Sequence, residues 1–279
     1  MKKISRRSFL AAAGLSVAAL ALTACGGSSA STASSVASSA ASSEAASTSA
    51  AAGELTTVEA GKLTMATNAT FPPYEMTTDA GDIEGIDVET AQAIADKLGL
   101  ELQIDDMDFD AALLSVQQGK ADIVMAGVTV TDERKAVMDF SDSYATGIQS
   151  IIVPEGSDIA SPDDLAGKKI GTQRGTTGYI YCSDDFGDDA VVAYDNGLTA
   201  VQALNNGQVD AVVIDNAPAQ EFIAANPGLK ILDTSYAEED YAIGMAKGSS
   251  LEDAVNAALK ELKADGTLQS IVDKYITAE

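Results

Sequence analysis

One stretch of the sequence, 121-ADIVMAGVTVTDERK-135, combines residue types that suit the binding of a carboxylate. The apolar run from Ile123 to Ala126 predicts a buried strand, and Thr131 followed by two acidic residues predicts the start of a helix. Backbone N–H groups at the start of a helix lack partners and attract anions. Arg134 lies one turn further on, where its guanidinium can hold a carboxylate through two parallel hydrogen bonds. The residues alone fit a second interpretation equally well, in which Arg134 is exposed and pairs with one of the two acidic residues.

Elements that would position this stretch occur twice along the chain. A helix, a glycine that ends it, an aspartate and a buried strand are predicted in 113-LLSVQQGKADIVMAG-127 and again in 201-VQALNNGQVDAVVID-215. From Lys62 onward, short apolar runs alternate with amphipathic segments, which is typical of an α/β protein with mainly parallel strands. Ligands of such proteins bind at the carboxyl ends of the strands. The repeat indicates two similar lobes, although helix–glycine–strand units are also common in proteins with a single sheet.

The sequence also predicts the elements that flank these units. Helical spacing of apolar residues predicts a helix over 87–99. The segment 161-SPDD-164 is expected to begin a short helix, with a strand following at 169–172. The C-terminal segment 250–276 predicts two amphipathic helices separated at Asp265-Gly266. Their apolar faces need a lobe to pack against.

Composition excludes several functions. The formal net charge of −25 repels nucleic acid, so no nucleic-acid partner is expected. The chain has no histidine, which removes Ser-His and Cys-His catalysis and the imidazole ligands of most catalytic zinc sites. The acidic clusters near Asp105 and Asp184 lack the full loop of a calcium site and are expected to be solvated surface. We therefore expect neither a metal nor a cofactor.

The first residues of the chain indicate export. Residues 1–24 have a basic start, an apolar run and small residues before Cys25, the layout of a signal peptide on a lipoprotein. Cys25 is the predicted lipidation site, and residues 25–54 read as a disordered Ser/Ala linker. The protein is thus expected to be exported and lipid-anchored at the outer face of the cell membrane. Arg6-Arg7 also fits a twin-arginine signal, so the export route stays open.

An ordered series of motifs gives a resemblance to a known family. The motifs are 66-ATNATFPPYE-75, 85-GIDVETAQAIADKLG-99, 107-MDFDAALL-114, 125-MAGVTVTDERKAVMDFSDSY-144 and 264-ADGTLQSIVDKY-275. Together they resemble the polar amino acid binding proteins of ABC importers, solute-binding protein family 3. The resemblance implies a two-lobed, type II periplasmic-binding-protein-like α/β clamp with two hinge strands. Carried onto this chain, it places residues 55–143 and 244–279 in lobe 1, 148–239 in lobe 2, and hinges at 144–147 and 240–243.

The resemblance also implies roles for particular residues. Arg134 would hold the α-carboxylate of an amino acid with the backbone N–H groups of Thr129 and Thr177, and Asp215 would hold the α-ammonium. The Gly127 carbonyl and the Thr129 hydroxyl would complete the ammonium shell. The predicted ligand-binding residues are Asn68, Phe71, Phe109, Gly127, Thr129, Arg134, Gln173, Thr177 and Asp215.

Four of these positions bear on the side chain of the ligand. Phe71 and Phe109 resemble an aromatic pair that sandwiches it. Asn68 stands where several relatives have an acidic residue, and Gln173 and Ile214 stand where glutamine-binding relatives carry Lys and His. These departures favour a polar, uncharged amino acid, with Glu75 as an acid that could lie nearby.

The function implied by the resemblance is the capture of a polar α-amino acid and its delivery to an ABC permease, by a monomer that is not an enzyme. Two alternatives are a dehydratase-like enzyme on the same fold and a module that senses amino acids. An enzyme would need a general acid in the cleft. Asp215 is expected to be ion-paired, which lowers its pKa and makes it a poor general acid.

Overall fold

The computed structural model describes residues 55–276 of the chain. The predicted signal peptide (1–24), the predicted lipid attachment at Cys25 and the predicted linker (25–54) lie outside the described residues. Within the described part, no helix combines the length and the apolar character needed to cross a membrane.

Lobe 1, as we use the name from here on, is the first sheet with its helices. Its strand order is β5 (Glu101–Asp106), β1 (Lys62–Thr67), β6 (Ile123–Val124), β14 (Gly244–Ala246) and β7 (Met138–Phe140). The first three strands are parallel, and β14 runs antiparallel to both of its neighbours. The helices are α1 (Ile86–Leu98), α2 (Phe109–Gln117), α3 (Asp132–Val137), α7 (Glu252–Ala264) and α8 (Thr267–Tyr275).

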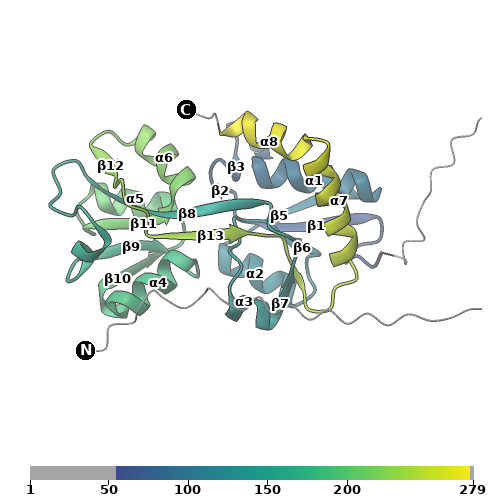
Figure 1. The fold of residues 1–279 in the computed structure, drawn as a ribbon, viewed down its shortest axis with the longest axis horizontal. Helices are drawn as coiled ribbons and strands as arrows, with labels where there is room; N and C mark the ends of the chain where they lie inside the picture. The colour runs from purple at the N-terminus through teal and green to yellow at the C-terminus, as the bar shows by residue number, and fades with distance from the viewer. Residues whose placement is uncertain (1–54, 277–279) are drawn as a thin grey trace, which may run out of the picture. The chain divides into compact units, whose positions relative to one another are not determined.

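Alternation along the strands of lobe 1 makes a core on each face of the sheet. Leu63 and Met65 belong to the core cluster of α1, α7 and α8, and Ala66 belongs to the cluster of α2. Figure 1 shows α1, α7 and α8 on one side of the sheet and α2 on the other. The C-terminal helices separate at Asp265-Gly266 as predicted, and their leucines join the same core as Leu63. Their apolar faces therefore pack on lobe 1.

Lobe 2 is the second sheet with its helices. Its strand order is β10 (Val191–Tyr194), β9 (Ile170–Gln173), β11 (Ala211–Asp215), β8 (Ala145–Pro154) and β12 (Leu229–Ile231), and β13 (Ala237–Tyr241) also pairs with β8. The helices are α4 (Thr177–Phe186), α5 (Gly197–Asn205) and α6 (Asn216–Ala225), with 3₁₀ turns η1 (Pro162–Leu165) and η2 (Asp188–Ala190). Here too alternate strand residues serve opposite faces: Val212 packs with α5 and α6, whereas Val213 packs with Cys182 of α4.

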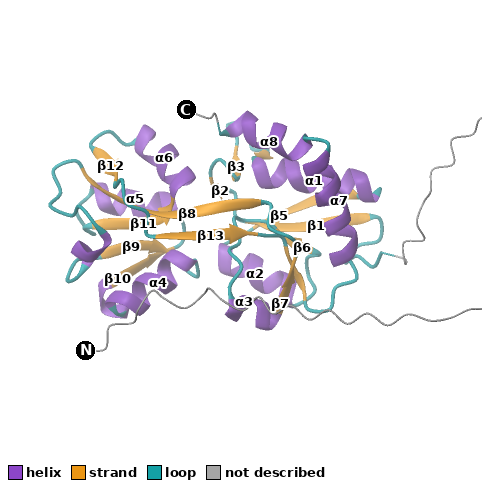
Figure 2. Ribbon diagram, in the orientation of Figure 1, coloured by secondary structure: helices purple, strands orange, loops and turns teal. Residues whose placement is uncertain are grey.

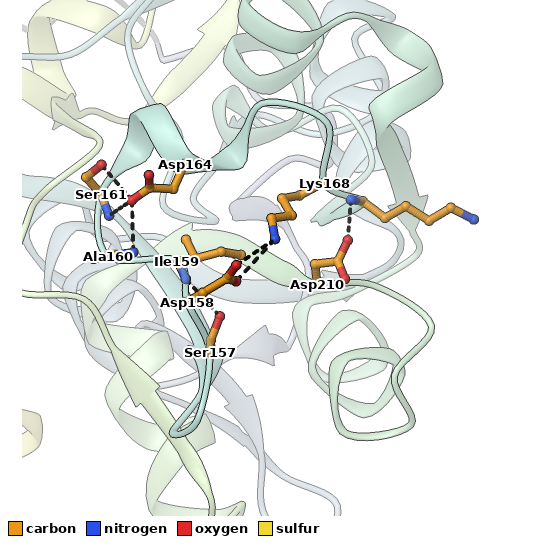
Figure 3. A network of polar contacts seen from close by, with 9 residues as sticks. Ser157, Asp158, Ile159, Ala160, Ser161, Asp164, Lys168 and Asp210 are labelled. Atoms are coloured by element: carbon orange, nitrogen blue, oxygen red, sulfur yellow. Dashed lines mark hydrogen bonds and ion pairs between the residues drawn. The ribbon is translucent and has the colours of Figure 1, made fainter.

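Two smaller features bear on the strands near the cavity described below. A three-stranded antiparallel sheet, β2 (Thr70–Phe71), β3 (Glu75–Thr77) and β4 (Ile83–Glu84), follows β1. In lobe 2, a polar network precedes β9 (Figure 3). Asp164 accepts hydrogen bonds from the backbone and hydroxyl of Ser161, and Asp210 accepts one of 2.7 Å from the Lys169 N–H. The predicted start at Ser161 is confirmed as a capping box, but the turn that follows is a 3₁₀ helix.

Strands β8 and β13 connect the two lobes (Figure 2). They pair antiparallel from Ala145↔Tyr241 to Gln149↔Ala237, so they form a continuous two-stranded ribbon. The predicted hinges, 144–147 and 240–243, overlap one end of this ribbon. Rotation of the lobes about these residues, and the predicted lobe boundaries, stay predictions.

One predicted strand is shorter than expected. The run from Ile123 to Ala126 was expected to be a strand, but β6 contains only Ile123 and Val124. The chain turns away from the sheet at Gly127, which has a φ of 56°, and Thr129 then forms an isolated bridge with Tyr241 at the end of β13.

We expect a Gly147→Ala substitution in β8 to lower the free energy of unfolding. A Cβ at position 147 would lie 2.5 Å from the ring of Tyr241 and 2.7 Å from a carboxylate oxygen of Asp215. Both side chains are fully buried, so they cannot move aside cheaply. Overpacking of this kind costs about 1–3 kcal/mol. Urea unfolding measures the loss.

The matched control for this prediction is Gly156→Ala. A Cβ at position 156 meets nothing within 4 Å, and like Gly147 this glycine lies outside the left-handed region. Its substitution should change stability by no more than about 0.5 kcal/mol. Equal stability of the two variants would show that the packing around Gly147 is loose.

Candidate functional site

A cavity lies where strand ends and helix starts of lobe 1 and lobe 2 meet. The space between its atoms, including its open mouth, is about 450 Å³. Every residue predicted for ligand binding lines it: Asn68, Phe71, Phe109, Gly127, Thr129, Arg134, Gln173, Thr177 and Asp215. The structure therefore brings the predicted residues together, and their roles in binding stay predictions. The lining also includes residues that were not predicted to bind the ligand: Glu75, Ala126, Gln149, Thr176, Val213, Ile214 and Tyr241.

Arg134 lies in α3 at the wall of this cavity. Thr131 caps the helix, because its hydroxyl accepts the Arg134 N–H at 3.2 Å. The guanidinium is buried and donates to the Thr129 carbonyl at 2.8 Å and to the Gly175 carbonyl of lobe 2 at 3.1 Å. The ring of Phe109 lies 5.4 Å from it. Among the described residues Arg134 forms no ion pair, so the interpretation as an exposed arginine paired with its neighbours is wrong.

Unpaired backbone N–H groups flank this guanidinium. Within residues 55–276, no hydrogen-bond acceptor is found for the N–H of Thr129 or of Thr177. Thr177 is the first residue of α4, whose N-cap is Thr176, and the N-terminus of a helix favours negative charge. The residues that carry these two N–H groups and the guanidinium all line the same cavity. A carboxylate has the charge and the acceptor oxygens to pair with them.

Asp215 lies at the carboxyl end of β11, on another wall of the cavity. Its carboxylate accepts from the Ile148 N–H at 2.7 Å and from the Ala217 N–H at 3.1 Å. Burial raises the pKa of Asp215 to about 6, although the hydrogen bonds that it accepts act to lower it. The expectation of a lowered pKa is thus not met in the protein alone, because no described lysine or arginine pairs with this carboxylate. An ammonium group would complement it.

Two amides meet across the lobes at a further part of the cavity. The Gln173 side-chain nitrogen donates to the Asn68 side-chain oxygen at 2.9 Å, and Asn68 in turn donates to the Met107 carbonyl. Neither side chain carries a charge. This region can offer hydrogen bonds to a ligand but no ion pair.

The two predicted aromatic residues have different neighbours. Phe71 stacks on Tyr74 with ring centroids 5.8 Å apart, and Tyr74 meets Tyr241 edge-on. Phe109 instead lies against the guanidinium of Arg134. Both rings line the cavity, but in this arrangement Phe109 also supports the arginine.

Glu75, the acid that the sequence analysis names as a possible neighbour of the ligand side chain, is buried in the cavity wall. Its side chain is fully buried, and neither carboxylate oxygen has a hydrogen-bond partner among the described residues. Burial and the nearby Asp87 hold the pKa of Glu75 well above its usual value, which favours the uncharged form of this acid. Asp87, whose pKa burial raises to about 6, accepts the Gly127 N–H at 2.9 Å and so fixes that turn.

The cavity lining thus presents one guanidinium, Arg134, and one carboxylate, Asp215, while the raised pKa of Glu75 favours its uncharged form. This arrangement suits a zwitterion, whose two charges would each meet the opposite charge. In residues 55–276 no group of three potential metal ligands is found.

The two lobes and this cavity define a binding protein for a small solute. One family model, "Bacterial extracellular solute-binding proteins, family 3", matches residues 63–278, and the chain belongs to that family. The L-cystine-binding protein TcyJ of Escherichia coli (strain K12) is 33% identical over 226 residues, 79% of this chain and 85% of that protein.

Solved structures agree with this assignment. The arginine-, lysine-, histidine-binding protein ArtJ of Geobacillus stearothermophilus is 34% identical, with a TM-score of 0.75 over 78% of this chain and 96% of that one. An ancestral arginine-binding protein bound to glutamine is 42% identical, with a TM-score of 0.75 over 78% of this chain and 99% of that one. The predicted class, a type II two-lobed α/β binding protein, is confirmed.

Proposed function

We propose that this protein captures a free polar α-amino acid outside the cytoplasm and delivers it to the permease of an ABC importer. One observation carries the proposal. A single cavity presents a buried guanidinium with two free N–H groups on one wall and the ionisable carboxylate of Asp215 on another. The α-carboxylate would bind Arg134 and the N–H groups of Thr129 and Thr177, and the α-ammonium would bind Asp215.

The side chain of the ligand would extend toward Asn68 and Gln173. Because both are amides and burial favours the uncharged form of Glu75, this end of the cavity is poorly suited to a cationic side chain. We therefore favour a polar, uncharged amino acid. Related ancestral arginine-binding proteins bound to glutamine and to arginine are compatible with either choice, and ArtJ and TcyJ also make the basic amino acids and cystine the alternatives to test.

Delivery would occur at the membrane. The predicted signal peptide would direct export, and the predicted lipid on Cys25 would hold the protein at the outer face, close to the permease. Ligand that bridges Arg134 and Asp215 would stabilise the closed form of the two lobes, which the permease would recognise.

A thermal-shift screen tests the proposal. The purified protein is first unfolded and refolded to remove copurified ligand, then heated with each of the twenty amino acids, ornithine, citrulline or cystine. At a free concentration of about 100 times its Kd, a ligand stabilises the folded state by about 2.7 kcal/mol. This raises Tm by roughly 5–10 °C in a folded protein of this size. A shift with a polar amino acid is expected. No shift with any of them would reject the function.

A dehydratase is the second candidate, because one observation favours it. With its pKa raised to about 6, Asp215 can donate a proton near neutral pH. Turnover of prephenate or arogenate by the purified protein would establish the enzyme. We expect none.

A further inference from the structure

Glu239 is a buried acid on the connecting strand β13. It is not among the residues that line the cavity, and its side chain is only 6% exposed. One of its oxygens, Oε2, accepts three hydrogen bonds: from the Thr129 hydroxyl at 3.0 Å, the Thr177 hydroxyl at 3.0 Å and the Gln149 side-chain nitrogen at 3.1 Å. A single carboxylate oxygen thus holds three side chains that all line the cavity.

The three donors come from separate elements. Thr129 belongs to the segment of lobe 1 that bridges to Tyr241, Thr177 begins α4 in lobe 2, and Gln149 lies in β8. The two hydroxyl oxygens lie 3.5 Å apart, one from each lobe. Glu239 therefore fixes the distance between the two threonines at the place where the lobes meet.

This arrangement decides what the two hydroxyls can offer to a ligand. A hydroxyl group has one hydrogen to donate and two lone pairs that accept. Because Thr129 and Thr177 both donate to Glu239, only their lone pairs remain for the cavity. A carboxylate cannot bind such groups, whereas an ammonium can. The N–H groups of the same two residues have the opposite preference.

Glu239 also affects the pKa of the Arg134 guanidinium. Burial lowers the pKa of Arg134 below its usual value, and the negative charge of Glu239 is the main influence that acts against this. The second oxygen of Glu239, Oε1, is buried without a hydrogen-bond partner among residues 55–276. An unpaired buried oxygen costs stability, so fold stability alone does not account for an acid at this position.

We propose that Glu239 is a positioning residue of the amino-acid site, which holds the Thr129 and Thr177 hydroxyls as its donors so that they present only acceptors to the ligand. The inference rests on the proposed function. In this role Glu239 determines the orientation of a bound zwitterion. The ammonium lies toward the hydroxyls and Asp215, and the carboxylate lies toward the N–H groups and Arg134.

The test compares four variants with the natural protein. Glu239→Leu removes the acceptor, Glu239→Gln keeps an amide oxygen in its place, and Glu238→Leu changes the exposed neighbour on the same strand. Thr177→Val removes one hydroxyl. Kd is measured by calorimetry for the amino acid that gives the largest shift in the screen, and Tm is measured without ligand.

We expect Glu239→Leu to raise Kd by about 30-fold and Glu239→Gln by less than about 5-fold, because the amide oxygen still accepts from the hydroxyls. Glu238→Leu should leave Kd within about twofold, as is usual for surface changes away from a site. A purely structural role predicts something else: Tm of Glu239→Leu would fall while Kd stayed within twofold of the natural value. That result would overturn the proposal.

A double-mutant cycle keeps the test decisive. Thr177→Val should raise Kd by about 10-fold in the natural protein but by less than about twofold in the Glu239→Leu background, because coupled residues are not additive. Equal effects in both backgrounds would contradict the proposal. If Glu239→Leu does not fold, Thr177→Val alone decides, since unchanged affinity would show that the hydroxyl does not serve the ligand.

The two hypotheses fail in different ways. If the natural protein binds no amino acid, the proposed function is wrong, and this inference falls with it. If the natural protein binds and Arg134→Ala does not, the function stands, and normal binding by Glu239→Leu rejects only the role of Glu239.

Discussion

An Arg134→Ala variant is expected to lose most of its affinity for amino acids, with a Kd at least about 100-fold above that of the natural protein. The guanidinium is the only cationic group in the lining of the cavity within the described residues. Its loss would leave the carboxylate of a ligand buried without its counter-charge, which costs about 2–5 kcal/mol. Calorimetric titration with the amino acid found in the screen measures the change.

The control for this prediction is Arg174→Ala. Arg174 lies just after β9, but its side chain is 56% exposed and its partner is the exposed Asp195. Exposed pairs of this kind contribute about 0–1 kcal/mol, and affinity should be unchanged. Arg134→Lys should also bind weakly, because an ammonium cannot span the Thr129 and Gly175 carbonyls and still hold a carboxylate with two parallel bonds. Normal binding by Arg134→Ala would place the ligand elsewhere.

Asp215→Asn is expected to have an effect of similar size, at least about 100-fold in Kd, because it leaves an ammonium in a buried cavity without a counter-charge. Asp195→Asn, which changes an exposed carboxylate of lobe 2, is the matched control and should bind normally. If both variants bound alike, the ammonium would not lie at Asp215.

The dependence of affinity on pH separates Asp215 from the other acids. Its pKa in the free protein is raised to about 6. Since only the ionised carboxylate attracts an ammonium, Kd should rise by about 10-fold between pH 7 and pH 5. Asp215→Asn should bind weakly and equally at both pH values. A flat profile in the natural protein would show that the carboxylate does not take part.

The stability of the free protein should change in the opposite direction. An acid whose folded pKa is raised contributes stability that is complete below its unfolded pKa and is lost as the pH rises through the folded pKa. For Asp215 and Asp87 this loss extends from the ordinary pKa of 3.8 up to the folded value of about 6. The stability of Asp215→Asn relative to the natural protein should therefore increase from pH 5 to pH 7. Urea unfolding without ligand at the two values measures the difference.

Much of the site was predictable because its residues follow local rules. The cap at Thr131 placed Arg134 one helical turn from the strand end, and the resemblance to a family then decided between a ligand-binding and an exposed arginine. Asp215 could be placed because a buried apolar strand ends there. The resemblance to a family then supplied Asn68, Phe71 and other residues that no local pattern singles out.

The residues that were missed depend on contacts between distant segments. Gln149, Glu239 and Tyr241 belong to strands whose exposure to the cavity depends on how β8 pairs with β13. A sequence shows that Glu239 follows another glutamate but not which of the two points inward. The state of Glu75 was equally out of reach, because its raised pKa results from burial next to Asp87.

The site depends on the register in which β8 pairs with β13. Along β13 the buried residues Glu239 and Tyr241 alternate with the exposed Glu238 and Asp240. Deleting one residue before this run would exchange the two sets, because neighbouring strand residues face opposite sides. Every amino acid of the cavity would still be present in the chain, but Glu238 and Asp240 would face the threonines. Binding therefore depends on which residues of β13 face inward as much as on which residues the chain contains. The number of residues that precede them in the connection between the lobes decides which ones face inward.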